Sequence, residues 1–294
     1  MNTNFINVGR KSVQLSQPFN ATVSDMIGRE AEMRKILAAW MCGNSGFPLS
    51  PLLLSEPGIG KNRITYEAAR VCGKDLFVFQ GHEEVTSDDL VCTVRFSDDP
   101  ERKMDYILSP LASAMLQKNA ICFIDEIAKI RPRALAPLAS LLDERRYIDS
   151  NILGERIFAS PGFRFIAASN TVDLESNMFP DFIRSRMRPI INVGYPVKDE
   201  IDRIIRSRFQ TLHNNGNALL DLFWTLWRDK NGDRSPTPRD SIYIFGYALN
   251  LADFEAIEGN APYLLEGANG DSNIKQEHIE QAFAAFHDIP EEIG

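Results

Sequence analysis

A glycine-rich stretch between a predicted strand and a predicted helix carries the first residues that could do chemistry. It reads Ser55-Glu56-Pro57-Gly58-Ile59-Gly60-Lys61-Asn62-Arg63. Backbone N–H groups of such a turn can surround an anion, and the N-terminus of the following helix favours negative charge. A lysine at this position reaches the β and γ phosphates of a nucleotide. The stretch therefore predicts a phosphate-binding loop, with an ordinary glycine turn before a helix as the alternative.

Two positions of this loop differ from the usual pattern G-x-x-x-x-G-K-[ST]. Ser55 stands at the first glycine, and Asn62 stands where a hydroxyl usually ligates magnesium. The amide oxygen of Asn62 can ligate Mg²⁺, but its side chain is one bond longer than that of a serine and carries a competing N–H₂ group. We therefore expect weak Mg²⁺ dependence and slow turnover, partly recovered in Asn62→Thr.

An apolar strand that ends in two carboxylates carries the second signal. Residues 121–124 are all apolar, and Asp125 and Glu126 follow them directly. The carboxyl ends of strands in a parallel sheet face the ligand crevice. There Asp125 can hold Mg²⁺, and Glu126 can polarise a water for attack on a phosphate. The alternative is that both carboxylates cap the next helix, because anions are favoured at a helix N-terminus.

The elements that must position these residues form an α/β pattern, followed by a helical one. Short apolar runs separated by helical stretches indicate a parallel sheet covered on both faces, with strands at 51–54, 76–79, 120–124, 163–168 and 190–193. Beyond Pro196 the periodicity predicts helices alone, at 201–209, 219–227, 241–254 and 275–287. We therefore place a domain boundary near residue 196. Residues 1–20 are polar without a clear period, which predicts an N-terminal arm.

Composition narrows the classes of function. The 294 residues include 32 Lys and Arg against 40 Asp and Glu, a net charge of −8, so the chain lacks the basic surplus typical of nucleic-acid binding. The four cysteines are at least twenty residues apart, which excludes a CxxC pair and indicates a reducing compartment. With no signal peptide and no apolar span, we expect a soluble, cytoplasmic protein without a membrane partner. The histidines share no metal-ligand spacing; they are His82, His213, His278 and His287.

Taken together, these residues resemble the AAA+ ATPases. Four further segments match that family in order along the chain: Ile27-Gly28-Arg29-Glu30, the strand ending at Asn170, the segment from Phe179 to Arg186, and Pro238-Arg239 at the start of a helix. In the family the first of these segments lies near the adenine, and the second carries the residue called sensor 1. The third carries the arginine finger, and the fourth carries sensor 2. The resemblance extends from Ile27 to the last predicted helix.

Within the AAA+ ATPases, the sequence is similar to the MoxR group. The run 141–146 (LLDERR) followed by Gly154-Glu155, and the run from Phe179 to Pro196, resemble two tracts of that group. The alignment makes Arg186 the arginine finger and Arg184 a second candidate, with a solvated basic face as the alternative. Members have two β-hairpin insertions, which we expect here at 88–107 and 146–157. The charged cluster at 98–103 is predicted as a hairpin tip in water, or alternatively as a pore element that touches a client.

The resemblance implies a fold and a set of site residues. We expect a P-loop NTPase parallel sheet sandwiched by helices over residues 21–196, and an all-helical AAA+ lid domain over 197–294. ATP and Mg²⁺ would be the cofactors, with the nucleotide contacted by Ile27 and by the loop residues Glu56, Pro57, Gly58, Ile59, Gly60, Lys61, Asn62 and Arg63. Asn62 and Asp125 would ligate Mg²⁺. The catalytic residues would be Glu126, Asn170, Arg186, Arg184 and Arg239.

The resemblance also implies an activity and partners. Members of the group hydrolyse ATP in hexameric rings and remodel or activate a protein partner in a chaperone-like manner. That partner is often a von Willebrand factor A-domain protein. Two alternatives stay open. One is a nucleic-acid-directed AAA+ motor, and the other is a nucleotide-binding scaffold with little hydrolysis, which Ser55 and Asn62 favour.

Lys61→Ala tests the phosphate-binding loop. Charge-assisted hydrogen bonds are worth roughly 1.5–3 kcal/mol each, so losing the ammonium should weaken ATP binding at least tenfold. Binding is measured by titration with a fluorescent ATP analogue. Unchanged affinity in this variant would show that this stretch is an ordinary glycine turn and does not bind phosphate.

Overall fold

The computed structural model describes residues 5–20, 26–42, 46–97, 103–176, 179–209, 212, 216–256 and 272–287. The chain divides into two compact units. The first comprises residues 1–57 and 61–193, and the second comprises residues 58–60 and 194–294. The division after residue 193 lies close to the expected boundary near 196.

The first unit contains strands and helices, whereas the regular elements described in the second unit are helices. The elements of the first unit are β1 (Phe5–Val8), β2 (Lys11–Gln14), α1 (Glu30–Trp40), β3 (Leu52–Ser55), α2 (Lys61–Cys72), β4 (Asp75–Gln80), β5 (Cys92–Phe96), β6 (Met104–Leu108), α3 (Pro110–Leu116), β7 (Ala120–Asp125), the 3-10 helix η1 (Ile127–Lys129), α4 (Leu138–Leu141), β8 (Tyr147–Ser150), β9 (Glu155–Phe158), β10 (Arg164–Asn170), α5 (Thr171–Ser176), α6 (Asp181–Arg184) and β11 (Ile190–Asn192). Those of the second unit are α7 (Lys198–Arg208), α8 (Gly216–Asn231), α9 (Pro238–Ala256) and α10 (Gln276–His287).

The centre of the first unit is a parallel five-stranded sheet in the order β11-β3-β10-β7-β4. Every residue of β3 and β7 is buried. Strands covered on both faces need apolar side chains at consecutive positions, which explains the uninterrupted apolar run from Ala120 to Ile124. All five predicted strands and their parallel arrangement are confirmed.

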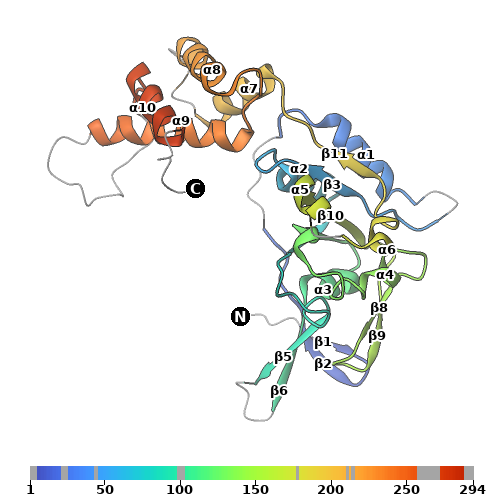
Figure 1. The fold of residues 1–294 in the computed structure, drawn as a ribbon. Coiled ribbons are helices and arrows are strands. Elements are labelled where there is room, and N and C mark those ends of the chain that lie inside the picture. Colours follow the sequence, from blue (N-terminus) through green and yellow to red (C-terminus); the bar gives the residue numbers. More distant parts are fainter. Residues whose placement is uncertain are drawn as a thin grey trace. The chain divides into compact units, whose positions relative to one another are not determined.

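Helices cover both faces of this sheet. The chain runs from β3 through α2 to β4 in one direction across the sheet, and from β4 through α3 to β7 in the opposite direction. Because such crossovers are right-handed, α2 and α3 must lie on opposite faces. Figure 1 shows α1 and α2 on one face and α3 on the other. The predicted sandwich of a parallel sheet between helices is confirmed.

The segment predicted as an N-terminal arm contains a β-hairpin instead. Strands β1 and β2 pair antiparallel, and β2 pairs parallel with β6, which gives a second sheet in the order β1-β2-β6-β5. The side chains of Val13 and Leu15 are fully or almost fully buried in the core. The prediction of an arm is therefore wrong for residues 5–16. Each strand has only four residues, which is too short for a clear alternation, and the partner strand β6 lies far along the chain.

Both expected hairpin insertions are present, and the N-terminal hairpin contacts each of them. Strands β5 and β6 pair antiparallel, as do β8 and β9. Beyond the pairing of β2 with β6, Lys11 Nζ donates a hydrogen bond to the carbonyl of Ile152, at 2.6 Å. The carboxylate of Glu155 lies directly against Gly9, whose φ of +58° suits glycine. Of the charged cluster at 98–103, all but Lys103 lies outside the described residues.

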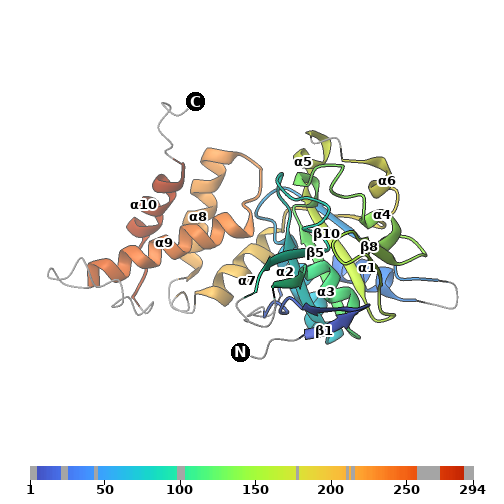
Figure 2. The ribbon, with the colours of Figure 1, turned by 90° about the horizontal axis from the view of Figure 1, so that it is seen from below.

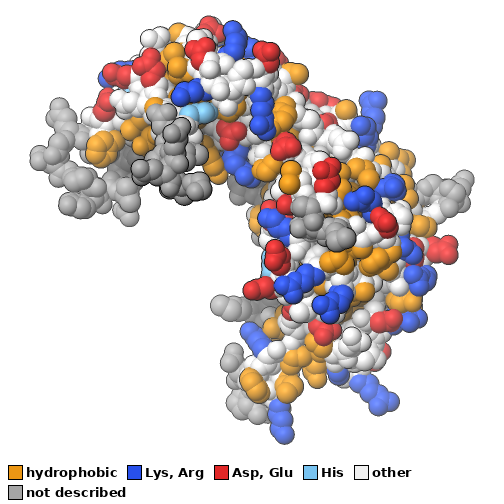
Figure 3. All heavy atoms as spheres, viewed as in Figure 1, with side chains coloured by type: hydrophobic (Ala, Val, Ile, Leu, Met, Phe, Trp, Pro, Cys, Tyr) orange, Lys and Arg blue, Asp and Glu red, His pale blue; other side chains and the backbone are white. Residues whose placement is uncertain are grey.

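The β5–β6 hairpin carries an apolar face from the core into solvent. At its base Cys92 and Leu108 are opposite each other and buried. Towards its tip, Phe96 and Met104 are opposite each other and are 84% and 51% exposed. Hydrophobic side chains gather at this end of the first unit in Figure 3. Apolar side chains thus share one face of the hairpin, buried at its base and exposed towards its tip.

The regular elements of the second unit are all helices within its described residues, as predicted. Figure 2 shows α8, α9 and α10 side by side. Their shared core is aromatic, with Phe223 in ring contact with Phe245 and Trp227, and Trp227 with Phe283. No helix among the described residues is long and apolar enough to cross a membrane.

Gly162→Ala tests the packing that positions β10. A Cβ at Gly162 would lie 1.9 Å from the carbonyl oxygen of Lys118, a backbone atom that cannot turn away. Overpacking of this kind costs about 1–3 kcal/mol, so the free energy of unfolding in urea should fall by that amount. Gly46→Ala is the control, because a Cβ there meets nothing within 4 Å. Equal stability of the two variants would contradict this packing.

Candidate nucleotide-binding site

The phosphate loop predicted from the sequence joins β3 to α2. Gly58 and Gly60 have φ angles of +83° and +102°, which residues with a side chain rarely adopt. This backbone path brings Lys61 to the first position of α2. The glycines are therefore required by the turn itself, and the loop ends at a helix N-terminus, where anions are favoured.

Lys61 is folded back over its own loop. Its side chain is buried, and Nζ lies 3.0 Å from Ser55 Oγ and 3.3 Å from the carbonyl oxygens of Ser55 and Glu56. It also donates to Asn170 Oδ1, at 2.8 Å. Ser55, which replaces the first glycine of the usual pattern, thus supplies an acceptor for the lysine.

The carboxyl ends of four parallel strands bring the polar residues together. Ser55 ends β3, Gln80 ends β4, Asp125 ends β7 and Asn170 ends β10. In the register of the sheet, Asn170 is level with Ser55 and Gln80 is level with Asp125. Lys61 and Asp125, both singled out from the sequence, lie at this edge of the sheet, where Lys61 contacts Asn170 and Asp125 contacts Asn62.

Asp125 is a buried carboxylate held by two donors. Asn62 Nδ2 donates to Oδ2 at 2.7 Å, and the backbone N–H of Glu126 donates to Oδ1 at 2.9 Å. Burial raises the pKa of Asp125 above its ordinary value, and these two hydrogen bonds oppose the shift. A carboxylate that burial destabilises in its charged form is suited to a cation, and Mg²⁺ prefers oxygen ligands. The residues present therefore fit Mg²⁺, with Asp125 as its carboxylate ligand.

Glu126 turns out of strand β7 in a left-handed conformation, with φ 53° and ψ 40°. Two side chains bind the same oxygen, Oε2: Gln80 Nε2 at 2.8 Å and Lys129 Nζ at 3.0 Å. Neither partner was predicted from the sequence. Gln80 could have been found as a polar residue that ends an apolar strand, whereas Lys129 gave no such signal.

Asn170 links the lysine to the helix that follows β10. Its Oδ1 accepts from Lys61, and its Nδ2 donates to Asp173 Oδ2 at 2.9 Å. The orientation of the amide is thereby fixed by a partner at each end. This is the sensor 1 position of the resemblance, and the structure places it beside the phosphate loop.

The predicted arginine-finger residues lie on and just after α6. Arg186 Nη1 donates to the carbonyl of Phe182 at 2.7 Å, and its Nε lies 3.5 Å from Asp143 Oδ2. The side chain of Arg186 remains 33% exposed. Arg184 is half-buried, and its Nε has no hydrogen-bond partner within the described part of the chain.

For the remaining predicted site residues, the structure gives the burial of each side chain and its position along the chain. Ile27 is half-buried and precedes Gly28 and Arg29, which both have positive φ angles. Arg63 is half-buried in the first turn of α2. Arg239 is exposed at the second position of α9, in the second unit.

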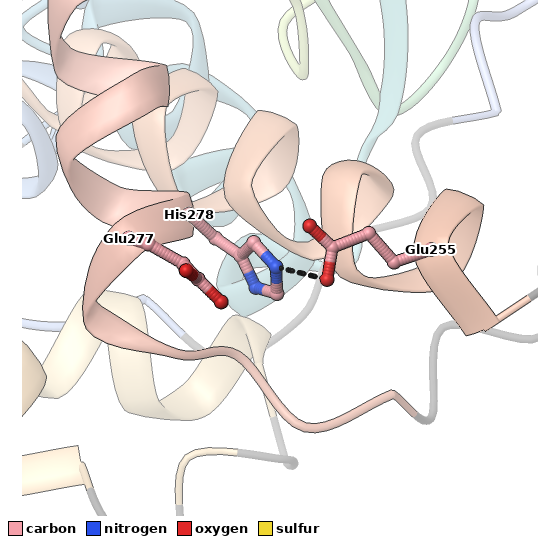
Figure 4. A group of neighbouring side chains, drawn as sticks. All are labelled: Glu255, Glu277 and His278. Carbon is pink, nitrogen blue, oxygen red and sulfur yellow. Dashed lines mark ion pairs between the residues drawn. The ribbon is translucent and has the colours of Figure 1, made fainter.

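A second cluster of metal-ligating residue types lies in the second unit. Glu255, Glu277 and His278 bring their polar atoms close together (Figure 4). His278 Nδ1 accepts the backbone N–H of Lys275, so the neutral ring carries its proton on Nε2, 2.9 Å from Glu255. Lys275 Nζ also lies 3.3 Å from Glu255 and 3.1 Å from Glu277. These contacts form a network between the end of α9 and the start of α10.

Comparisons with known proteins agree with this geometry. Residues 51–187 match the AAA domain of the dynein-related subfamily. NorQ of Paracoccus denitrificans is 31% identical over 121 residues, which cover 41% of this chain and 43% of NorQ. An uncharacterised protein of Staphylococcus saprophyticus is 25% identical over 161 residues, 54% of this chain and 60% of that protein. The chain thus matches about half the length of these curated relatives.

Solved structures show the same fold. RuvB of Thermotoga maritima, described as a Holliday junction branch migration motor, superposes with a TM-score of 0.56 and 17% identity, covering 88% of this chain and 70% of RuvB. A point mutant of the same RuvB gives a TM-score of 0.58 and 18% identity, with the same coverage.

The parallel sheet, the phosphate loop and the helical second unit reproduce the fold of these solved structures. Over residues 51–187 the chain is an AAA domain of the dynein-related subfamily. The predicted family, AAA+ of MoxR type, is confirmed for this part of the chain.

Proposed function

We propose that this protein hydrolyses ATP. The proposal is based on four side chains at the same edge of the sheet. Lys61 donates a hydrogen bond to Asn170, and Asn62 donates one to Asp125. A phosphate loop, a carboxylate for Mg²⁺ and polar groups that can orient a water are the parts that hydrolysis of a nucleoside triphosphate needs. The AAA domain over residues 51–187 supports the same activity.

The loop would bind the phosphates of ATP. Its N–H groups would surround them, and Lys61 would exchange Ser55, Glu56 and Asn170 for phosphate oxygens. Asp125 would hold Mg²⁺, whose charge would stabilise the phosphate oxygens during transfer. Because Lys61 Nζ already lies at the loop, the lysine itself would only need to change acceptors.

Glu126 and Asn170 would prepare the water. Glu126 would accept a proton from it, and Oε1 is the oxygen that we assign to this step, since Oε2 is bound by Gln80 and Lys129. Asn170 would orient the water once Lys61 has moved to the phosphates. Arg239 would report the γ-phosphate to the helical unit.

We also propose a hexameric ring in which Arg186 acts on the nucleotide of a neighbouring subunit, with Arg184 as the second candidate. The contact of Arg186 with Asp143 is long, at 3.5 Å, and partly exposed, so it costs little to exchange for a phosphate. The energy released would remodel or activate a protein partner in the cytoplasm, in a chaperone-like manner. A von Willebrand factor A-domain protein is the proposed client.

One observation favours a second function, a nucleotide-binding scaffold with little hydrolysis. Asn62 presents its N–H₂ group to Asp125, where a hydroxyl would usually help to hold Mg²⁺. A nucleic-acid motor has less support, because the likeness to RuvB is one of fold and the net charge of −8 disfavours phosphate backbones.

Glu126→Gln separates the enzyme from the scaffold. The variant keeps the shape of the side chain but cannot accept the proton, so it should bind ATP as the parent does and release phosphate at least 100-fold more slowly. Its ion pair with Lys129 is partly exposed and worth about 1 kcal/mol or less, so the fold should be retained. Phosphate release and ATP binding are measured side by side. If the parent binds ATP yet releases no more phosphate than Glu126→Gln, the scaffold is the correct function.

Mixing two inactive variants tests the ring. Arg186→Ala should bind ATP normally but hydrolyse almost none, because an arginine finger contributes roughly 10³–10⁵ in rate, mainly in the transition state. Lys61→Ala should fail because its own site stays empty. In a mixture, an Arg186→Ala subunit holds ATP beside a Lys61→Ala neighbour that still offers Arg186, so activity should return in part.

The mixture must exchange subunits for this result to be informative, which labelled subunits can show. If exchange is complete and no mixture regains hydrolysis, the role of Arg186 at a neighbouring site is wrong.

A further inference from the structure

A tyrosine on α2 lies beside Asn62, one helical turn further along the chain. Positions four apart on a helix share a face, which puts Tyr66 and Asn62 side by side. The ring of Tyr66 packs edge-on against Phe123, with centroids 6.5 Å apart and an interplanar angle of 83°. It also packs against Phe19, with centroids 5.2 Å apart. The ring therefore contacts both strand β7 and the N-terminal segment.

The hydroxyl of Tyr66 forms a hydrogen bond with the side chain of Asn62. Burial raises the pKa of Tyr66, the negative charge of Asp125 raises it further, and a hydrogen bond with Asn62 opposes the shift. The hydroxyl is therefore bound to Asn62 and lies within the influence of the Asp125 charge. No sequence motif indicates a role for Tyr66, and the proposed hydrolysis of ATP assigns it none.

Asn62 donates to the carboxylate that would hold the cation. Its Nδ2 is 2.7 Å from Asp125 Oδ2, while the backbone N–H of Glu126 holds Oδ1. An amide that points its nitrogen at Asp125 acts on this carboxylate as a donor. It is therefore oriented to fix the carboxylate, whereas the sequence led us to expect its oxygen on Mg²⁺.

We propose that Asn62 and Tyr66 are positioning residues: Tyr66 orients the Asn62 amide, and Asn62 orients the Asp125 carboxylate, which alone of these three side chains would ligate Mg²⁺. This inference rests on the proposed nucleotide site. It gives a role to Asn62, which stands where the usual pattern has a hydroxyl. Tyr66, four residues later, contributes by orienting the Asn62 amide.

The chain offers a matched set of substitutions. Tyr66→Phe removes the hydroxyl and keeps the ring between Phe19 and Phe123. Asn62→Thr supplies a hydroxyl that can ligate the cation directly and is too short to use Tyr66. Tyr106→Phe is the control, because it also removes a tyrosine hydroxyl from the first unit, on strand β6.

The experiment measures metal binding directly. Full-length protein saturated with ADP is titrated with Mn²⁺, and free Mn²⁺ is followed by electron paramagnetic resonance. ADP affinity without metal is measured on the same samples. A net hydrogen bond corresponds to roughly a two- to tenfold change in an equilibrium constant.

We expect Tyr66→Phe to weaken Mn²⁺ binding two- to tenfold in the parent and less than twofold in the Asn62→Thr background. Metal-free ADP affinity should stay within twofold of the parent in Tyr66→Phe, and Tyr106→Phe should match the parent in both measurements. An effect of Tyr66→Phe that depends on the residue at position 62 shows that Tyr66 acts through Asn62. A general loss of packing would weaken Mn²⁺ binding equally in both backgrounds.

The inference is overturned if Tyr66→Phe leaves Mn²⁺ affinity unchanged, if it has equal effects in both backgrounds, or if Tyr106→Phe has the same effect. In these cases ADP still binds, and the proposed nucleotide site stands. Failure of the parent to bind ADP at all would overturn the nucleotide site, and the inference with it.

Discussion

Two opposite charges are buried at the carboxyl edge of the parallel sheet, and the local structure is arranged around them. Lys61 and Asp125 are 8% and 9% exposed. Buried charges are costly unless hydrogen bonds compensate them. The lysine is compensated by oxygens of its own loop and by Asn170, and the carboxylate by Asn62 and a backbone N–H. The register of the strands therefore has two roles. It pairs the strands of the sheet, and it aligns the strand ends that carry these hydrogen-bond partners.

The sheet could be predicted because its signal is local. The run from Ala120 to Ile124 is apolar at every position, and a strand buried on both faces is the simplest structure that hides such a run. The N-terminal hairpin could not be predicted, because in β2 the only fully buried side chain is Val13. Its stability comes from pairing with β6 and from core residues far along the chain, which no local pattern reports.

The candidate site also contains some residues that the sequence predicts and others that it does not. Lys61, Asp125 and Asn170 follow from strand ends and a glycine turn, because parallel strands align their carboxyl ends. The partners of Glu126 do not follow, since Gln80 and Lys129 meet on one oxygen only through the register of β4 and the turn after β7. The direction of the Asn62 amide also lay beyond the sequence, because it depends on which atom of the side chain faces Asp125.

The N-terminal hairpin has a consequence for the solubility of shortened chains. Strand β2 occupies the edge of β6 that would otherwise present unpaired N–H and C=O groups. A truncation that removes residues 1–20 as if they were a tail would leave this edge open and uncover the apolar surface under Val13 and Leu15. Open edges of this kind pair readily with strands of other molecules. Such a shortened protein would therefore be prone to self-association, even with its phosphate loop intact.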